Sequence, residues 1–413
     1  MKKRILLIGY NFYPEPTGIG KYSGEMMYWL SQQGYDCTAL TGYPYYPHWQ
    51  VQEPYTKSRF WFKTETETFA SGGRLTIYRC PMYVPSKPTG LKRILLDLSF
   101  LISAFFKLLQ LLPGKKFDCV IAVAPSFQFG LLGVLYKKLC SAKLVYHIQD
   151  LQIEAARDLQ LIKSESGIKL LLKIEKYIFN NSDIISSISP GMTQRVSLKA
   201  GKGVLFFPNW TNINQFYLIK DKASLKTEFG FNSTDKIVLY SGAIGEKQGL
   251  EMILFAAQAL HGIKELKFVI CGSGPYKQHL ENLTKELHIQ NILFLPLQPA
   301  EAFNRFLNTA DIHLVIQKSN ASDLVMPSKL TTVLAVGGLA IITADEGSSL
   351  HALVKEYDMG RLIKAGNQQA LNEGIRQALF TDNTVVTHNA RSYAESHLSI
   401  EAVMRDFETA IGI

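Results

Sequence analysis

The chain has 413 residues, and at about 100–200 residues per domain this length predicts two or three domains. Hydrophobic residues make up 47% and charged residues 19%, which excludes an intrinsically disordered chain. The five cysteines include no CxxC pair and no closely spaced group, so the sequence excludes a disulfide scaffold and a structural zinc cluster and favours a reducing compartment.

The net charge of +9 is unevenly distributed along the chain. Residues 1–207 hold 26 Lys and Arg against 14 Asp and Glu, whereas residues 208–413 hold 18 against 21. A basic first half and a mildly acidic second half indicate two domains with different partners. An anionic membrane, a phosphorylated substrate and a nucleic acid all fit the basic half, but no zinc-finger, helix-turn-helix or RNP-like motif supports a nucleic acid.

Short apolar runs alternate with helical patterns along the whole chain. The predicted strands are Arg4–Gly9, Asp36–Thr41, Leu75–Arg79, Asp118–Val123, Lys143–His147, Asp183–Ser187, Lys236–Tyr240, Leu266–Cys271, Ile292–Leu295, Asp311–Ile316 and Leu339–Thr343. The predicted helices are Lys21–Gln33, Phe127–Cys140, Gly167–Asn180, Leu250–Leu260, Tyr276–Leu287, Ala300–Asn308 and Ser328–Val336. Because strands that alternate with helices form parallel sheets with covered faces, the sequence predicts an α/β fold.

This alternation occurs in two separate runs, which predicts two doubly wound, Rossmann-like domains that face a ligand cleft. We expect the seam at Phe207–Trp210, so that the first domain spans residues 1–207 and the second residues 208–386. The last helical segments, Thr387–Ser396 and Ile400–Ile411, follow no new strand. Residues 387–413 are therefore expected to cross back to the first domain.

The first strand-to-helix junction, Tyr10–Gly20, contains glycines near its end. Gly18 and Gly20 would let backbone amides approach a ligand, and the following helix would offer free N–H groups and the positive end of its dipole. The prolines make this loop longer than the dinucleotide-binding GxGxxG. An ordinary tight turn is the alternative explanation.

A more specific pattern lies in the second half, at Tyr240–Glu251 (YSGAIGEKQGLE). The strand ends at Ser241 and Gly242, and Lys247 projects just before a helix, an arrangement that binds a diphosphate without a metal. A second loop, Gly272-Ser273-Gly274, follows the neighbouring strand and could share the same nucleotide. The alternatives are a surface lysine near a turn for the first loop and a plain turn for the second.

The segment Ser322–Lys329 leads into a helix that ends at Gly337-Gly338. Ser328 suits the N-cap of this helix, and the amides beside it suit a phosphate. The alternative is simple helix capping next to a solvated Lys329.

His147 and Asp150 stand at the end of the predicted strand Lys143–His147. A His–Asp pair at the edge of a cleft is a candidate for a functional site. A histidine that only satisfies its own hydrogen bonds is the alternative.

Residues 91–112 (LKRILLDLSFLISAFFKLLQLL) form a strongly apolar helical pattern. Asp97 and Lys107 would each cost about 2.5–3.5 kcal/mol at a bilayer centre, so we expect an interfacial or buried helix and no membrane span. Basic residues would favour an anionic surface by about 1 kcal/mol each, and five lie in or beside the helix: Lys87, Lys92, Arg93, Lys115 and Lys116. The alternative is a domain helix that is buried on most faces. The aromatic-rich segment Gly42–Phe62 suits a sugar or a lipid interface, or packs on the domain.

Together these segments resemble family 4 of the GT-B glycosyltransferases over essentially the whole chain. The resemblance is carried by the opening glycine loop, Tyr240–Glu251, Gly272–Pro275 and Met326–Gly338, and the stretches His147–Asp150 and Phe207–Trp210 are similar too. Within the family, the chain is most similar to exopolysaccharide enzymes of the colanic acid type, several of which are assigned as fucosyltransferases. The resemblance implies a GT-B fold, retention of configuration, and no metal or other cofactor.

The resemblance also implies roles for single residues. Lys247 matches the family lysine that binds the donor diphosphate, and Ser328-Lys329 occupy the loop that meets this diphosphate. Gly18 and Gly20 match the N-terminal glycine loop near the reaction centre. His147 matches a family histidine near the transferred sugar and the acceptor.

The chain departs from the family at three positions. The usual pair of glutamates, separated by seven residues, should fall at Leu324 and Thr332, and neither is acidic. The usual arginine ahead of the lysine is missing, because Ala243 stands near its place. These departures alter the contacts to the ribose and to the donor sugar, and so concern the donor more than the reaction class.

We therefore expect an enzyme that transfers a sugar from a GDP- or UDP-sugar to a polyprenyl-diphosphate-linked saccharide in exopolysaccharide or cell-surface glycan biosynthesis. Lys247, with Lys329 and helix N-termini, would stabilise the departing nucleoside diphosphate, and His147 and Asp150 would orient acceptor and sugar. The protein is expected to be cytoplasmic and peripherally bound to the inner face of the cell membrane.

Two alternatives stay open. A nucleotide-sugar epimerase of the same fold should carry acidic residues in the cleft and no membrane helix, and the basic, apolar stretch 91–112 speaks against it. A non-catalytic, membrane-docked subunit that binds a nucleotide sugar is compatible with the missing glutamates.

Overall fold

The protein divides into two compact units in a computed structural model that describes residues 2–16, 18–154, 164–318 and 327–413. The first unit comprises Met1–Phe207 and Asp406–Ile413, and the second comprises Pro208–Arg405. The C-terminal segment differs from the expected division. Helix α14 (Thr384–Tyr393) and the first half of α15 (Ile400–Ile411) belong to the second unit, and the chain returns to the first unit only at Asp406, with the second half of α15.

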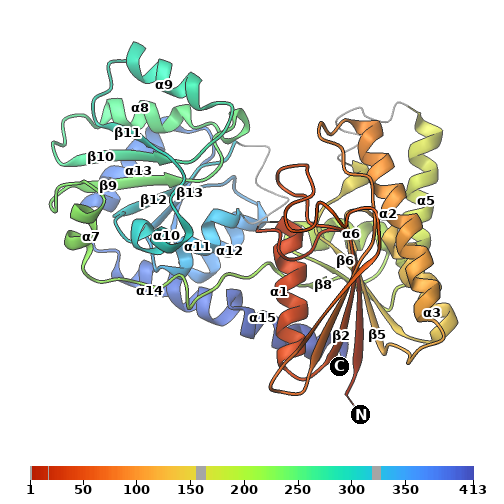
Figure 1. Ribbon diagram of the computed structural model, residues 1–413. Coiled ribbons are helices and arrows are strands. Elements are labelled where there is room, and N and C mark those ends of the chain that lie inside the picture. Colours follow the sequence, from red (N-terminus) through yellow and green to blue (C-terminus); the bar gives the residue numbers. More distant parts are fainter. Residues whose placement is uncertain (1, 17, 155–163, 319–326) are drawn as a thin grey trace. The chain divides into compact units, whose positions relative to one another are not determined.

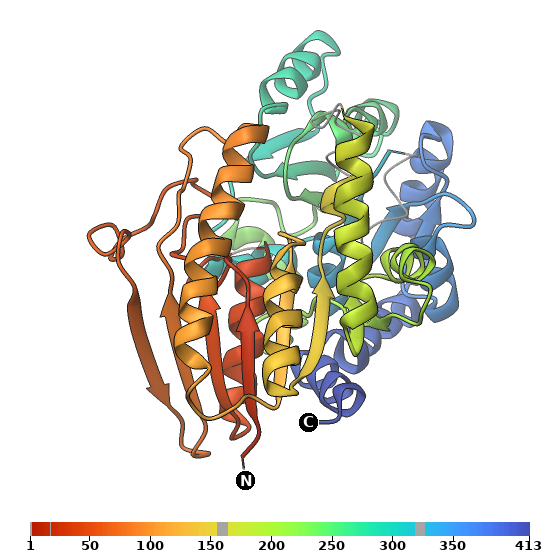
Figure 2. The ribbon, with the colours of Figure 1, turned by 90° about the vertical axis from the view of Figure 1, so that its right-hand side faces the viewer.

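The first unit is a sheet with helices on both faces (Figures 1 and 2). Its strands are β1 (Arg4–Ile8), β2 (Asp36–Thr41), β3 (Lys63–Thr68), β4 (Arg74–Arg79), β5 (Cys119–Ala124), β6 (Lys143–Ile148), β7 (Ile184–Ser187) and β8 (Leu205–Phe206), in the order β3-β4-β2-β1-β5-β6-β7-β8. Its helices are α1 (Gly18–Gln32), α2 (Gly90–Leu111), α3 (Phe129–Cys140), α5 (Glu165–Asn181) and α6 (Pro190–Ala200). Helices α2, α3 and α5 lie side by side on one face, and α1 lies on the other.

The second unit contains a parallel sheet in the order β11-β10-β9-β12-β13-β14. These strands are β9 (Lys236–Ser241), β10 (Leu266–Cys271), β11 (Ile292–Leu295), β12 (Ile312–Val315), β13 (Ala340–Thr343) and β14 (Arg361–Ile363). Its further helical elements are α7 (Lys222–Glu228), η1 (Glu246–Gln248), α8 (Glu251–Ala259), α9 (Lys277–Glu286), α10 (Ala300–Leu307), α11 (Ser328–Ala335), α12 (Ser349–Tyr357) and α13 (Gln368–Phe380).

The apolar runs form these strands because both sheet faces are covered, so every side chain of a central strand enters a core. All six residues of β5 are buried, as are four of the five residues of β1. All five cysteines are buried and free. The sequence analysis missed β3, whose polar sequence KTETET pairs antiparallel with β4 and is largely exposed, so it has no apolar signal.

In each sheet the strand order reverses direction at one point. The first unit winds from β1 through β2 to β4, and then restarts on the other side of β1 with β5. The second unit winds from β9 through β10 to β11, and restarts on the other side of β9 with β12. The loops that follow the two strands at such a switch point diverge, and the crevice between them is where open α/β sheets bind ligands.

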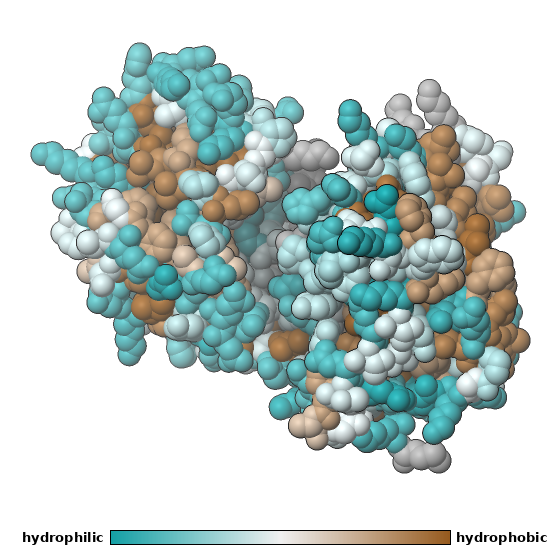
Figure 3. Space-filling model, viewed as in Figure 1, coloured by the Kyte–Doolittle hydropathy of each residue, from teal (hydrophilic) through white to brown (hydrophobic). Residues whose placement is uncertain are grey.

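Helix α2 has two different faces. Its buried face consists of Leu96, Asp97, Phe100, Ala104 and Leu108. Its exposed apolar residues are Leu91, Ile94, Leu95, Leu98, Ile102, Phe105, Phe106 and Leu109, which fall on the opposite stripe of the helix. Figure 3 shows hydrophobic side chains gathered in this part of the first unit. Among the described residues, α2 is the one helix long and apolar enough to cross a membrane by length and composition, a test that core helices also pass.

Candidate functional site

The two glycine loops of the second unit pack directly on each other at the carboxyl edge of the sheet. The Gly242 N–H donates to the Cys271 carbonyl (3.0 Å), and the Ile244 N–H donates to the Ser273 carbonyl (2.9 Å). A Cβ atom at Gly272 would lie only 1.9 Å from the Gly242 carbonyl oxygen, so this contact requires glycine. The predicted loops after β9 and β10 therefore form one continuous backbone surface.

Lys329, on the first turn of α11, reaches this surface. Its Nζ donates to the Tyr240 hydroxyl (2.7 Å), which in turn donates to the Ala243 carbonyl (2.7 Å). The ammonium also lies over the Tyr240 ring, 4.0 Å from its centroid, and a Cβ atom at Gly242 would be 3.3 Å from it. Burial lowers the pKa of Lys329 to about 8, so this side chain carries its charge at pH 7 and loses it as the pH rises above 8.

Lys247 lies in η1, between the strand end at Ser241 and the start of α8. Its side chain is outside the described parts of the structure. Gly249, which ends η1 in a left-handed conformation (φ 68°), packs against the stem of Lys318, whose Cγ would be 3.2 Å from a Cβ at this glycine. Lys318 follows β12, the strand next to β9 across the switch point. A lysine directly after such a strand is the pattern from which the sequence analysis could have predicted a cation near this loop.

The start of α11 differs from the expected cap. Ser328 is already the first helical residue, Pro327 occupies the cap position, and no side chain caps the helix. Ser328 therefore cannot be the N-cap, although it still stands one residue from Lys329. Of the two positions where the family has glutamates, Leu324 lies outside the described residues, and the Thr332 hydroxyl donates to the Lys329 carbonyl of its own helix (2.9 Å).

The glycine loop of the first unit has an internal reason for its glycines. Gly18 starts α1 with φ 63°, a left-handed conformation that favours glycine. A Cβ atom at Gly20 would lie 2.2 Å from Oε2 of the buried Glu15. Gly20 thus makes room for a side chain of its own loop, a cause that the sequence analysis did not consider.

His147 lies inside the first unit, near the end of β6. Its side chain is only 2% exposed, its Nδ1 is 2.9 Å from the Ser186 hydroxyl, and its ring packs edge-on against Phe207. Burial lowers its pKa to about 3, so the imidazole is neutral at pH 7. Asp150 lies in the loop beyond, where partial loss of water around its carboxyl raises its pKa. In the part of the chain that the structure describes, His147 contacts Ser186 and Phe207, and no hydrogen bond joins it to Asp150.

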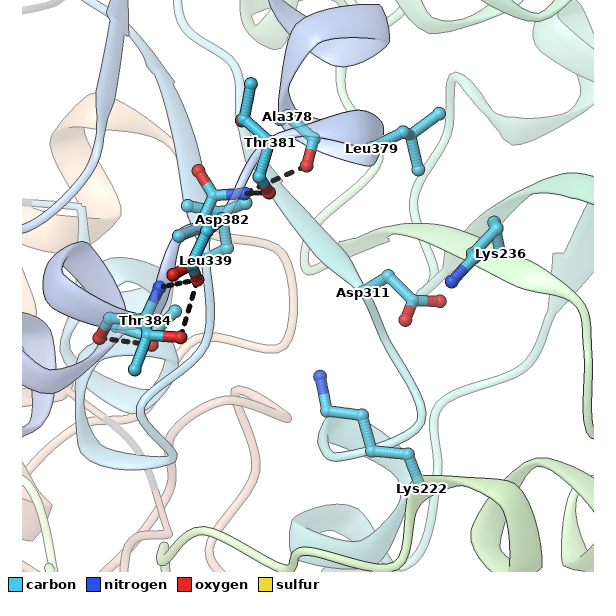
Figure 4. A pocket seen from close by; sticks show the side chains of 11 residues that line it. Lys222, Lys236, Asp311, Leu339, Ala378, Leu379, Thr381, Asp382 and Thr384 are labelled. Atoms are coloured by element: carbon cyan, nitrogen blue, oxygen red, sulfur yellow. Dashed lines mark hydrogen bonds between the residues drawn. The ribbon is translucent and has the colours of Figure 1, made fainter.

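The second unit also contains a cavity of about 250 Å³ (Figure 4). Lys236, at the first position of β9, and Asp311, just before β12, line it, so it opens at the amino edge of the sheet. The glycine loops follow the opposite, carboxyl ends of β9 and β10. Asp382 at its rim is engaged by the Thr384 N–H (2.9 Å) and hydroxyl (2.6 Å). This cavity is therefore separate from the glycine-loop site.

Both units match families of known proteins. Residues 17–210 match the family described as glycosyl transferase 4-like domain, and residues 221–396 match the family described as glycosyl transferases group 1. The chain is 41% identical over 414 aligned residues to WcaI of Escherichia coli K12, which is assigned as a colanic acid biosynthesis glycosyl transferase, with 98% of each chain covered. It is 21% identical to N-acetyl-alpha-D-glucosaminyl L-malate synthase of Bacillus anthracis, over 61% of this chain and 64% of the relative.

Solved structures share the fold at low identity. Sucrose-phosphate synthase of Thermosynechococcus elongatus gives a TM-score of 0.70 at 17% identity and covers 99% of this chain and 98% of its own. HepE of Anabaena in complex with UDP gives 0.68 at 14% identity over the full length of both chains. WaaG, a glycosyltransferase involved in lipopolysaccharide biosynthesis, gives 0.64 at 13% identity, over 98% of this chain and 99% of its own. The chain therefore belongs to the group 1, family 4-like glycosyltransferases and is a glycosyltransferase of GT-B fold.

Proposed function

We propose that this glycosyltransferase takes its sugar from a nucleoside diphospho-sugar that binds at the carboxyl edge of the second sheet. The observation that carries the proposal is the contact between the loops of Gly242 and Gly272, with the Lys329 ammonium beside it. Glycine backbone next to a cation is suited to a diphosphate, because the lack of side chains lets the phosphate oxygens come close to the backbone and to the positive charge. HepE has been solved with UDP and with UDP-glucose, which supports a nucleotide-sugar donor.

In the proposed reaction, negative charge develops on the nucleoside diphosphate as its bond to the sugar breaks. Lys247 and Lys329, with helix N-termini at this edge of the sheet, stabilise this charge where it forms. The transfer is proposed to need no metal ion and to retain the configuration of the sugar. No residue acts as a covalent nucleophile in this scheme.

The proposed acceptor is a polyprenyl-diphosphate-linked saccharide of a cell-surface polysaccharide, in keeping with the assignment of WcaI to colanic acid biosynthesis. Such an acceptor is anchored in a membrane. The exposed apolar stripe of α2 fits the acyl boundary of a bilayer, and the basic residues Lys87, Lys92, Arg93, Lys115 and Lys116 fit anionic headgroups. We propose that the protein binds the inner face of the cell membrane peripherally through α2.

Two measurements test the donor proposal. In a thermal-shift panel of UDP, GDP, ADP and their sugars, one nucleotide class should raise the unfolding temperature, because a ligand at 100 times its Kd stabilises the folded state by about 2.7 kcal/mol. The same radiolabelled nucleotide sugar should then label a lipid-linked acceptor. A panel in which no nucleotide stabilises the protein contradicts the proposal.

The transfer measurement also separates the alternatives. Conversion of the nucleotide sugar without an acceptor would identify an epimerase. Nucleotide binding with no turnover on any lipid-linked acceptor would point to a binding subunit and contradict the proposed transfer.

A further inference from the structure

Two carboxyl groups are buried beside the switch point of the first sheet, and the proposed chemistry uses neither. Glu15 lies in the loop between β1 and α1 and is 2% exposed, and Asp97 lies on the buried face of α2 and is 5% exposed. Burying a carboxylate is costly unless hydrogen bonds and charges compensate for the lost water. The partners of these two groups therefore indicate what the fold gains by keeping them.

Glu15 connects two loops at the carboxyl edge of the sheet. Its Oε1 accepts hydrogen bonds from the backbone N–H groups of Tyr45 and Tyr46 (both 3.0 Å), which follow β2. Its Oε2 accepts from Nδ2 of Asn11 (2.8 Å), which follows β1. The charge of the buried Arg79 on β4 also acts on this carboxyl, and the Arg79 guanidinium donates to the Tyr13 carbonyl of the same loop (2.7 Å).

Asp97 connects α2 to two further loops. Its Oδ2 accepts from the Ser126 hydroxyl (2.9 Å) after β5 and from Nε2 of Gln152 (3.0 Å) after β6. The Tyr10 hydroxyl, from the loop after β1, is a further hydrogen-bond partner of this carboxyl. Gln152 also accepts from the Phe127 N–H (3.1 Å), so the loops after β5 and β6 are bonded to each other as well.

The two carboxyl groups belong to one buried network. The Tyr45 hydroxyl is in hydrogen-bonding contact with Tyr10, which reaches Asp97, and with Asn11, which reaches Glu15. The network thus joins the loops after β1, β2, β5 and β6 to one another and to α2. Two of these strands, β1 and β5, flank the switch point, where an open sheet of this kind binds its ligand.

Desolvation is the largest influence on both acids, and it raises the pKa of Glu15 to about 7 and the pKa of Asp97 above its usual value. Apolar residues at these positions would avoid this cost. A fully bonded polar network instead holds a single arrangement of the segments that it joins.

We propose that Glu15 and Asp97 are positioning residues for sugar transfer, which hold the loops at the switch point of the first sheet in the geometry that the reaction requires. This inference rests on the proposed function, because it assumes that the glycine loop at Gly18–Gly20 faces the reaction. Neither carboxyl touches the substrate in this scheme. Each acts through the loops to which it is bonded.

The Gly20 contact allows a sharp test. A methyl group at position 20 would collide with Oε2 of Glu15, so Gly20→Ala should displace the same carboxylate that Glu15→Ala removes. Both single variants should lower kcat/KM by about 10- to 100-fold, the usual effect of misplaced supporting groups. The double variant should be no worse than the poorer single variant, because both changes break one contact.

Conservative variants separate positioning from charge. In Glu15→Gln the amide oxygen can still accept from Tyr45 and Tyr46, so kcat/KM should stay within a few fold of wild type. Asp97→Asn should likewise be milder than Asp97→Ala. Glu25→Ala, which removes a charge near the surface of α1, serves as the matched control and should leave kcat/KM unchanged.

Two readouts do not depend on turnover. Hydrogen exchange at the Tyr45 and Tyr46 amides should accelerate in Glu15→Ala and stay slow in Glu15→Gln, and the Kd for UDP should be unchanged in both. Faster exchange with undiminished kcat/KM would overturn the positioning role, and unchanged exchange would overturn the network. Loss of activity in Glu15→Gln equal to that in Glu15→Ala would point to direct contact with substrate and also overturn the inference. A wild type that binds no nucleotide would refute the proposed function, whereas the exchange result would still stand.

Discussion

The two sheets present different chemistry at equivalent places. Next to the switch point between β1 and β5, the loops of the first unit enclose two buried carboxyl groups, Glu15 and Asp97, within a hydrogen-bonded network. Next to the switch point between β9 and β12, the loop of Gly242 packs on the neighbouring loop of Gly272, and the Lys329 ammonium lies against it. The same strand topology therefore carries a buried network of hydrogen bonds around Glu15 and Asp97 in the first unit and lysines beside glycine loops in the second.

The net charge of each half of the chain is therefore a poor guide to the charge of the groups at its switch point. Residues 1–207 are strongly basic, yet two buried acids lie at the switch point of this unit with Arg79 acting on one of them. Other lysines and arginines lie elsewhere, for example in and beside α2. The mildly acidic second half places lysines at its switch point. The excess positive charge of the first unit is thus available to bind a surface, and we propose that this surface is the membrane.

Reversing the basic charges near α2 should have the largest effect, and it tests the proposed membrane contact. Replacing Lys92, Arg93, Lys115 and Lys116 together by Glu should release the protein from anionic vesicles, because each basic residue near such a surface contributes about 1 kcal/mol, or about 10³-fold in partitioning for four. Nucleotide binding by the second unit should be unchanged. Co-sedimentation with vesicles that contain an anionic lipid is the measurement, and activity on a lipid-linked acceptor should fall in parallel.

Wild-type binding should also weaken as salt is added, since exposed charges are screened within about 10 Å at 0.1 M. Wild type that stays in the supernatant at low salt, or a quadruple variant that pellets equally well, would show that α2 is not a membrane contact.

The next effect concerns the cationic edge of the second unit. Lys247→Ala should lower kcat by about 10²–10³, the cost of removing one group that stabilises developing negative charge, and Lys247→Met should behave alike because the charge is what matters. Lys236→Ala is the matched control, since it removes a lysine from the opposite end of β9. Near-normal turnover of the Lys247 variants would refute the proposed diphosphate site.

Much of this comparison was accessible from the sequence. Central strands such as β2 and β10 have the predicted bounds, because strands buried on both faces are written as apolar runs. The loops of Gly242 and Gly272 were predicted to follow neighbouring strands and to share one nucleotide, and the structure shows in addition that they contact each other. The family resemblance is confirmed by matches that cover both units.

The buried network around Glu15 and Asp97 could not be predicted from the sequence, for a physical reason. Glu15 binds amides 30 and 31 residues away, and Asp97 binds side chains 29 and 55 residues away, so no local pattern marks either residue. Asp97 was interpreted only as a cost to membrane insertion, whereas its carboxyl faces the interior and the exposed stripe of α2 bears no acid. The role of Gly20 depends on the same long-range contact.

A smaller effect is expected on the pH dependence of UDP binding, and it tests the role of Lys329. Because burial holds the pKa of Lys329 at about 8, below the ordinary lysine value, this lysine loses its proton as the pH rises from 7 to 9. At pH 9 about a tenth of the ammonium remains, so the affinity for UDP should fall by up to about tenfold between pH 7 and pH 9. Calorimetric titration of UDP at several pH values is the measurement.

The matched variant Lys329→Met should bind UDP more weakly at pH 7 and lose this part of the pH dependence. The stability of the protein without nucleotide should depend on pH in the opposite direction to the affinity for UDP. A lysine whose pKa is lowered on folding makes the folded state more stable as the pH rises from about 8 to the unfolded value, so unliganded stability and UDP affinity should diverge. An equal pH slope in wild type and Lys329→Met would remove Lys329 from the nucleotide site.

The smallest expected effect is none at all, and it tests whether the lysines of the second unit are sufficient. If Lys247 and Lys329 carry the positive charge that the departing diphosphate needs, activity should be unchanged after dialysis against EDTA, because an ammonium and oriented amides do the work that a divalent ion does in metal-dependent transferases. The measurement is the initial rate of sugar transfer with and without chelator. A full loss of rate that Mn²⁺ or Mg²⁺ restores would mean that a metal ion completes the donor site. The second unit would then differ from the first by a bound metal ion as well as by its lysines.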